Sequence, residues 1–163
     1  MQHLEKALKG NVNDGERRKI AMDLGAMRSG IKGEKEAAYH IDFHLKNSPN
    51  WVVIHDLRLD WKDRVAQIDH LLIDRYLEVY VVESKSFRTK VRCANGGWER
   101  LQGDHWQGIS SPVEQNERHI RVLKDVFEDL NLAPSRLGFR LTPTFLNVVL
   151  VAPDCSIIGQ FPE

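Results

Sequence analysis

Two segments near the middle of the chain decide the fold: VAQIDHLLI (Val65–Ile73) and VYVVESK (Val79–Lys85). Both are rich in valine and isoleucine, which favour strands, and the polar stretch Asp74–Glu78 separates them. This pattern predicts two strands joined as an antiparallel hairpin. The elements predicted before and after the hairpin complete the fold.

The turn also determines which residues lie opposite one another. If Ile73 pairs with Val79, the antiparallel register forms three further pairs: Leu71 with Val81, Asp69 with Glu83, and Gln67 with Lys85. Because side chains alternate between the faces of a strand, the four polar members of these pairs share one face. Directly opposed residues place their Cβ atoms about 4.5–5.5 Å apart. An aspartate and a glutamate are therefore expected within reach of one ligand.

Two carboxylates this close repel each other, and an apolar environment makes their charges costly. A divalent cation between Asp69 and Glu83 removes both penalties, since Mg²⁺ commonly binds one or two carboxylates together with waters and phosphate oxygens. Lys85 would lie beside the ion, where an ammonium orients an attacking water and neutralises charge on a phosphate. The alternative is a cross-strand ion pair at the surface, which isolated acid–x–lysine triplets also form.

The flanking sequence predicts the order helix, three strands, helix, strand. Apolar residues recur at helical spacing after Glu34, and Asn47–Pro49 ends that run. Trp51–Leu57 predicts the first strand. Ser111-Pro112 is typical of a helix N-cap and first helical position. Phe145–Val151 is apolar except for Asn147, which is typical of a strand covered on both faces. The fold class expected is α/β, with a mixed central sheet flanked by helices.

The length of 163 residues, with 42% hydrophobic and 28% charged residues, is typical of one globular domain and excludes a disordered or fibrous chain. Residues 1–29 are polar and contain several glycines, so we interpret them as an N-terminal arm with a short helix near Glu16–Met27. Residues 30–163 are expected to form the domain. The glycine-containing stretch Phe87–Ser110 is expected to be a hairpin or a long loop.

Charge and composition exclude several classes of protein. Twenty-three basic residues balance twenty-three acidic ones, so nucleic acid would have to be bound by local clusters rather than by bulk charge. The longest apolar run, Val148–Ala152, is too short for a transmembrane helix. The N-terminus has no secretory signal, which predicts the cytoplasm. Cys93 and Cys155 do not form a disulfide or zinc motif.

Two further polar residues lie on predicted helices. Glu34 precedes the apolar positions Ala38 and Ile41 by one and two turns, so it projects from the apolar face and is expected to meet a cation or donor. Its alternative role is compensation of the helix dipole from the first turn. Gln115 lies in the first turn of the second helix, beside its apolar stripe, where a simple polar residue is the alternative.

Basic residues cluster between positions 85 and 100. Five of them accompany a single acid, Glu99: Lys85, Arg88, Lys90, Arg92 and Arg100. Trp98 and Trp106 lie close by in the sequence and would stack on nucleic-acid bases. The alternative is a solvated hairpin with ordinary buried tryptophans.

Together these motifs resemble those of the nuclease-related domain (NERD) family, placed in the restriction-endonuclease-like PD-(D/E)xK superfamily. The resemblance covers about residues 30–152, and its motifs occur in order: Gly33-Glu34, QIDHLLI (67–73), ESK (83–85), Trp98 and SPVEQNERH (111–119). The superfamily core has the order αβββαβ, which matches the elements predicted above. One departure is the run after Lys85, which lacks the glycine common in family members.

The resemblance implies a metal-dependent nuclease that hydrolyses phosphodiester bonds of nucleic acid, with DNA as the expected substrate and Mg²⁺ (or Mn²⁺) as cofactor. It implies the following roles: Asp69, Glu83 and the Ser84 carbonyl as metal ligands, Lys85 as the catalytic lysine, Glu34 as the supporting helix acid, and Gln115 and Gln67 as accessory residues. Substrate contacts are expected from Gln67, Arg88, Lys90, Arg92 and Trp98.

Two other functions remain open. One is an inactive module of the same fold that binds nucleic acid or protein within a larger DNA-processing protein, by fusion or association. The presence of Asp69, Glu83 and Lys85 together argues against it, because a decayed site is free to lose them. The other is a structural α/β domain with a surface cluster of charges.

Overall fold

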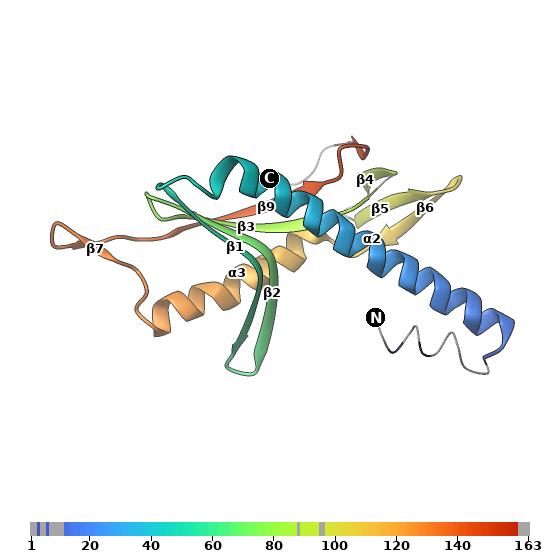
Figure 1. The fold of residues 1–163 in the computed structure, drawn as a ribbon, viewed down its shortest axis with the longest axis horizontal. Helices are drawn as coiled ribbons and strands as arrows, with labels where there is room; N and C mark the ends of the chain where they lie inside the picture. Colours follow the sequence, from blue (N-terminus) through green and yellow to red (C-terminus); the bar gives the residue numbers. More distant parts are fainter. Residues whose placement is uncertain (1–2, 4–5, 7–11, 88, 95–96, 160–163) are drawn as a thin grey trace.

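The computed structural model describes residues 3, 6, 12–87, 89–94 and 97–159 of the chain (Figure 1). Arg88, one of the expected substrate-binding residues, lies outside the described residues. Within the described part, neither helix combines the length and the apolar character that a membrane span requires.

The central sheet has four strands in the order β1-β2-β3-β9. They are β1 (Trp51–Trp61), β2 (Arg64–Asp74), β3 (Glu78–Lys85) and β9 (Thr144–Val151). The pairs β1–β2 and β2–β3 are antiparallel, and β3–β9 is parallel. The sheet is therefore mixed, and its strands follow the predicted order in the chain, which confirms the α/β fold class.

Two long helices cover the sheet, with α2 (Asp14–Leu45) above it and α3 (Pro112–Asp129) below it in Figure 1. The Ser111 hydroxyl caps α3 by accepting a hydrogen bond from the Glu114 N–H at 3.2 Å, as predicted. The α3 face holds the main core, whose fully or nearly buried members are Ile68, Leu71, Val79, Val81, Ile120 and Leu123. Burial of this apolar area holds α3 on the sheet.

Helix α2 is longer than predicted. The sequence predicts a short helix near Glu16–Met27 and another from Glu34, but one 32-residue helix spans both, with Asn13 and Glu16 forming a capping box at its start. The prediction of two helices was wrong because it took the glycines as breaks. A Cβ atom on Gly33 would lie only 2.6 Å from the Cβ of Ser86, so glycine is what lets α2 approach the end of β3. The helix passes through the boundary expected at residue 29, and the division into arm and domain stays a prediction.

A second sheet with the order β10-β4-β5-β6 forms beyond the end of β3 (Figure 1). Its strands are β4 (Lys90–Ala94), β5 (Gly97–Gln102), β6 (His105–Ile109) and β10 (Ser156–Ile158). The stretch predicted as a hairpin or loop is thus an antiparallel three-stranded unit, to which β10 adds in parallel. A small hairpin, β7 (Ser135–Arg136) and β8 (Phe139–Arg140), precedes β9.

Candidate active site

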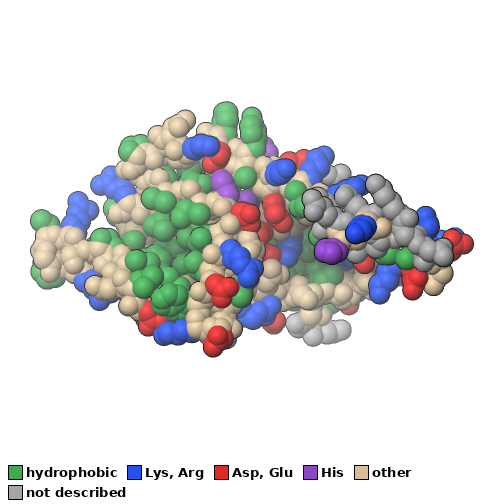
Figure 2. Space-filling model, turned by 60° about the horizontal axis from the view of Figure 1, so that its bottom comes forward, with side chains coloured by type: hydrophobic (Ala, Val, Ile, Leu, Met, Phe, Trp, Pro, Cys, Tyr) green, Lys and Arg blue, Asp and Glu red, His purple; other side chains and the backbone are tan. Residues whose placement is uncertain are grey.

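The residues predicted to be catalytic or to bind a metal meet where β3 ends, between the two helices. A cavity of about 420 Å³ lies there. It is lined by side chains from both helices and both strands of the hairpin, among them Glu34, Gln67, Asp69, Glu83, Lys85 and Gln115. Figure 2 shows acidic and basic side chains interspersed over the middle of one face, next to an apolar area. That mixture agrees with the zero net charge of the chain.

The register of the hairpin is the predicted one. Leu71 pairs with Val81, and Ile73 pairs with Val79. The pairing ends at His70 and Val82, so the expected pairs of Asp69 with Glu83 and of Gln67 with Lys85 are not part of the ladder. Beyond its end, the Asp69 carboxylate instead accepts a hydrogen bond from the Ser84 N–H at 2.7 Å. Asp69 is therefore held at the end of β3, next to the residue that follows Glu83.

Glu83 is the most buried acid of the site, with 3% of its surface exposed. Its Oε1 accepts hydrogen bonds from the Lys85 ammonium at 2.7 Å and from the Gln115 amide at 2.8 Å. Lys85 also donates to the Gln115 Oε1 at 3.2 Å, so the three side chains form a closed triangle. Glu83 Oε2 is buried and has no hydrogen-bond partner among the described residues, and the same holds for the Nδ1 of His119, 3.8 Å away.

Burial and mutual repulsion make the acids of this site costly to ionise. Removal from water is the largest cause that raises the pKa of Glu83, Asp69 and Glu34, and the neighbouring carboxylates raise it further. The Lys85 ammonium lowers the pKa of each acid but does not reverse these increases. A bound cation would stabilise the ionised forms.

Glu34 reaches the cavity from the middle of α2. The helix begins at Asp14, so Glu34 is five turns from the N-terminal charge of the helix dipole, which falls off within the first turn. Dipole compensation is therefore excluded as its role. The Asp69 charge raises the pKa of Glu34 and the Lys85 charge lowers it, which shows that the three groups share one electrostatic environment.

Asp56 is a neighbour of this site that sequence reasoning missed. It lies inside β1 with a φ of 54°, in the left-handed region, which aspartate tolerates better than most residues. Its carboxylate accepts a hydrogen bond from the Gln67 amide and raises the pKa of Asp69 and Glu34. No sequence signal marks such a conformation within a strand; the only hint is an aspartate inside the apolar run WVVIHDL.

Arg100 was noticed in the sequence only as part of the basic cluster, but its side chain lines the cavity. The Gln107 Oε1 accepts hydrogen bonds from the Arg100 Nε at 3.3 Å and from its Nη2 at 3.1 Å, which orients the guanidinium. Arg100 is thus a second cationic group near the acids, contributed by β5.

Gln67 lines the cavity, whereas three other expected substrate-binding residues, Lys90, Arg92 and Trp98, lie on the second sheet outside its lining. Arg92 pairs with Glu99 at 2.7 Å, and its guanidinium carbon lies 4.1 Å from the centre of the Trp106 ring. Lys90 is exposed at the start of β4, and Trp98 is partly buried on β5. Roles of Lys90, Arg92 and Trp98 in substrate binding stay predictions.

The donor set fits a magnesium ion that keeps part of its water shell. Within the described ranges, no three His, Cys, Asp or Glu side chains form a group able to enclose a metal. Mg²⁺ does not need one, because it usually binds through one or two carboxylates and completes its shell with waters and phosphate oxygens. Asp69 and the unpartnered Oε2 of Glu83 meet that requirement.

Comparison with known proteins bears on the same part of the chain. The family model described as nuclease-related domain (NERD) matches residues 29–151, which is most of the sequence. No curated protein and no solved structure shows a significant match. The matched range contains both helix residues and strand residues of the cavity. The chain belongs to the nuclease-related domain family.

Proposed function

We propose that this protein is a Mg²⁺- or Mn²⁺-dependent nuclease that hydrolyses phosphodiester bonds, with DNA as its substrate. The observation that carries the proposal is Glu83 Oε2, which is buried and without a hydrogen-bond partner among the described residues, in a cavity shared with Asp69 and Lys85. An unpaired buried carboxylate oxygen costs free energy, and a cation offsets that cost.

Asp69 and Glu83 would hold the metal, with the Ser84 carbonyl as a further ligand. When bound, the ion supplies Lewis-acid polarisation of the phosphate and lowers the pKa of a bound water. Lys85 keeps its ammonium in place through Glu83 and Gln115, at 2.7 and 3.2 Å. From there it orients the attacking water and neutralises charge that develops on the phosphate. Glu34 supports the site from α2.

The cationic groups near the cavity suit a phosphate backbone. Arg100 lines the cavity itself, and Lys90 adds an exposed positive charge on the second sheet, where Arg92 is paired with Glu99. Trp98 on the same sheet would stack on a base. Because the whole chain carries no net charge, binding depends on these local groups and weakens as salt is added. The intact set Asp69, Glu83 and Lys85 favours a catalyst over an inactive binding module.

The test is a cleavage assay on linear, nicked, branched and single-stranded DNA and on RNA, with Mg²⁺, with Mn²⁺ and with a chelator. We expect cleavage of DNA by the wild type only when a metal is present, and none by Asp69→Asn. Binding of DNA without cleavage in every metal would favour the inactive module. Equal cleavage by wild type and Asp69→Asn would refute the assignment.

A further inference from the structure

A chain of hydrogen bonds crosses the sheet on the face opposite to Asp69 and Glu83. Asp42 Oδ1 on α2 lies 3.1 Å from His55 Nε2 on β1, and His55 Nδ1 lies 2.8 Å from His70 Nδ1 on β2. His70 Nε2 then lies 2.9 Å from the Ser84 Oγ on β3. Three hydrogen bonds thus link α2, β1, β2 and β3 in series.

The members of this chain are sequence neighbours of the site residues. His70 follows Asp69 directly, and Ser84 lies between Glu83 and Lys85. Successive residues on a strand point to opposite faces. His70 and Ser84 of the chain are therefore fixed to the same stretches of backbone as Asp69 and Glu83, whose side chains point to the other face. A displacement of His70 or Ser84 therefore displaces a metal-binding carboxylate as well.

The Asp42 carboxylate gives the chain a direction. A carboxylate only accepts, so His55 Nε2 carries the proton and, with both rings neutral, His55 Nδ1 accepts from His70 Nδ1–H. His70 Nε2 is then left to accept from the Ser84 hydroxyl. Every donor meets an acceptor, which leaves one tautomer for each ring and one orientation for the hydroxyl.

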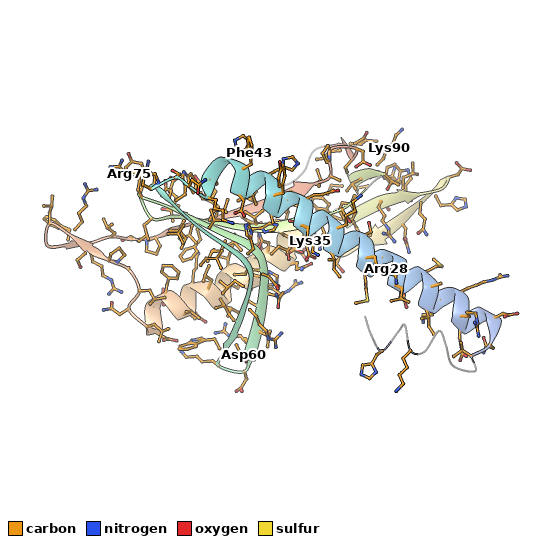
Figure 3. The ribbon with its side chains drawn as sticks, viewed as in Figure 1. Arg28, Lys35, Phe43, Asp60, Arg75 and Lys90 are labelled. Atoms are coloured by element: carbon orange, nitrogen blue, oxygen red, sulfur yellow. The ribbon has the colours of Figure 1, made fainter. Side chains whose placement is uncertain are left out.

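Burial isolates the centre of this chain from water, since His70 is only 2% exposed. Figure 3 labels Lys35 and Phe43 on α2, the helix that contributes Asp42 to the chain. Ser84 is restrained from two sides, since its N–H donates to Asp69 and its Oγ to His70.

We propose that Asp42, His55 and His70 are positioning residues of the nuclease site: through the Ser84 hydroxyl they hold the ends of β2 and β3 so that Asp69 and Glu83 can share one cation. The inference rests on the function proposed above. Partners that orient metal ligands through hydrogen bonds commonly contribute about 10- to 100-fold to metal affinity or activity.

The test uses variants at the outer end of the chain, which leave the site residues unchanged. His55→Ala removes the middle link. Asp42→Ala removes the end link, whereas Asp42→Asn keeps an acceptor oxygen. Lys46→Ala is the matched control, because Lys46 is the other partner of Asp42, at 3.1 Å, and is not part of the chain.

Mn²⁺ affinity by calorimetry and steady-state cleavage of DNA are the readouts. We expect His55→Ala to lose about 10- to 100-fold in Mn²⁺ affinity or in kcat with KM for DNA nearly unchanged. Asp42→Ala should lose less, and Asp42→Asn and Lys46→Ala should match the wild type. If His55→Ala does not fold by circular dichroism, the comparison of Asp42→Ala with Asp42→Asn decides, because Asp42 lies on the helix surface with 29% of its side chain exposed.

Nitrogen NMR of the histidine rings at pH 8 supplies a readout that does not depend on nuclease activity. The chain requires a proton on His55 Nε2 and on His70 Nδ1, and a proton on His70 Nε2 would overturn it. Wild-type protein that binds Mn²⁺ and cleaves DNA, with His55→Ala and Asp42→Ala equally active, refutes this inference alone. Wild-type protein that neither binds Mn²⁺ nor cleaves refutes the proposed function, and the inference with it.

Discussion

The two faces of the sheet at the end of β3 differ in how their polar atoms are satisfied. On the α2 face, both ring nitrogens of His55 and of His70 have hydrogen-bond partners. On the α3 face, Glu83 Oε2 and His119 Nδ1 are buried and have no hydrogen-bond partner within the described part of the chain. Because an unsatisfied buried polar atom costs about 1–3 kcal/mol, we propose that the satisfied face is the scaffold and that a ligand binds at the unsatisfied face.

Lys85→Ala should have the largest effect, because it removes the only ammonium hydrogen-bonded to Glu83 among the described side chains. We expect a loss of about 10²- to 10³-fold in kcat, the range typical of a preorganised group that stabilises charge developing in the transition state. The matched control is Lys62→Ala. Lys62 ends the chain's other acid–x–lysine triplet, Asp60-Trp61-Lys62, and pairs with Asp129 away from the cavity.

Circular dichroism and thermal unfolding must show that both lysine variants are folded. A loss of cleavage confined to Lys85→Ala would tie catalysis to the unsatisfied face. Similar rates for the two variants would remove Lys85 from the mechanism.

Gly33→Ala probes the contact between α2 and the end of β3. The new Cβ would lie 2.6 Å from the Cβ of Ser86, so the helix or the strand must shift, and we expect a loss of about 1–3 kcal/mol in the free energy of unfolding. Gly25→Ala is the control, since a Cβ there meets no heavy atom within 4 Å and alanine favours the helix by about 0.5–1 kcal/mol. Denaturant unfolding measures both changes, and opposite signs are the expected result; stabilisation by both would mean that the close approach is absent.

Asp69→Asn should have the smallest effect of these substitutions, and it should stabilise the metal-free protein, whereas Gly33→Ala destabilises it. Its pKa is raised in the folded protein, so the folded state binds the proton more tightly than the unfolded chain, and stability falls as pH rises from near the ordinary value of 3.8 through the raised pKa. At higher pH, the neutral amide of Asp69→Asn avoids the cost of burying an ionised carboxylate, and its oxygen still accepts the hydrogen bond from the Ser84 N–H. After allowance for solvent screening we expect a gain of about 2 °C in the Tm of the metal-free protein at pH 7.5.

Scanning calorimetry at pH 7.5 and at pH 4 separates this effect from a general change in packing. The gain should shrink at pH 4, where Asp69 takes up a proton, and added Mn²⁺ should stabilise the wild type but not the variant. A lower Tm for Asp69→Asn at pH 7.5 would show that Asp69 is already stabilised as an anion without a metal.

Local patterns predicted the part of the site that a hairpin builds. The strands around Asp74–Glu78 have the expected pairs, Leu71 with Val81 and Ile73 with Val79, because turn length and alternation are local properties. The Ser111 cap placed Gln115 in the first turn of α3, and from there it reaches Glu83. His70, the neighbour of Asp69 on the same strand, is 2% exposed.

Long-range packing accounts for what the sequence did not predict. The glycines of α2 favour a break when considered locally, but Gly33 is accommodated because it lies against Ser86. Asp56 adopts a left-handed conformation within a strand, and Arg100 reaches the cavity from a second sheet. The chain from Asp42 through His55 links residues of α2 and β1 whose proximity no spacing in the sequence indicates.

A crystal of the wild-type protein soaked in Mn²⁺ and measured at the manganese absorption edge tests the central claim most directly. The proposed site predicts an anomalous peak about 2–2.5 Å from a carboxylate oxygen of Asp69 and from Glu83 Oε2, with His55 and His70 unchanged behind it. A fully soaked crystal with no peak between these two carboxylates, or with manganese bound elsewhere, would contradict it.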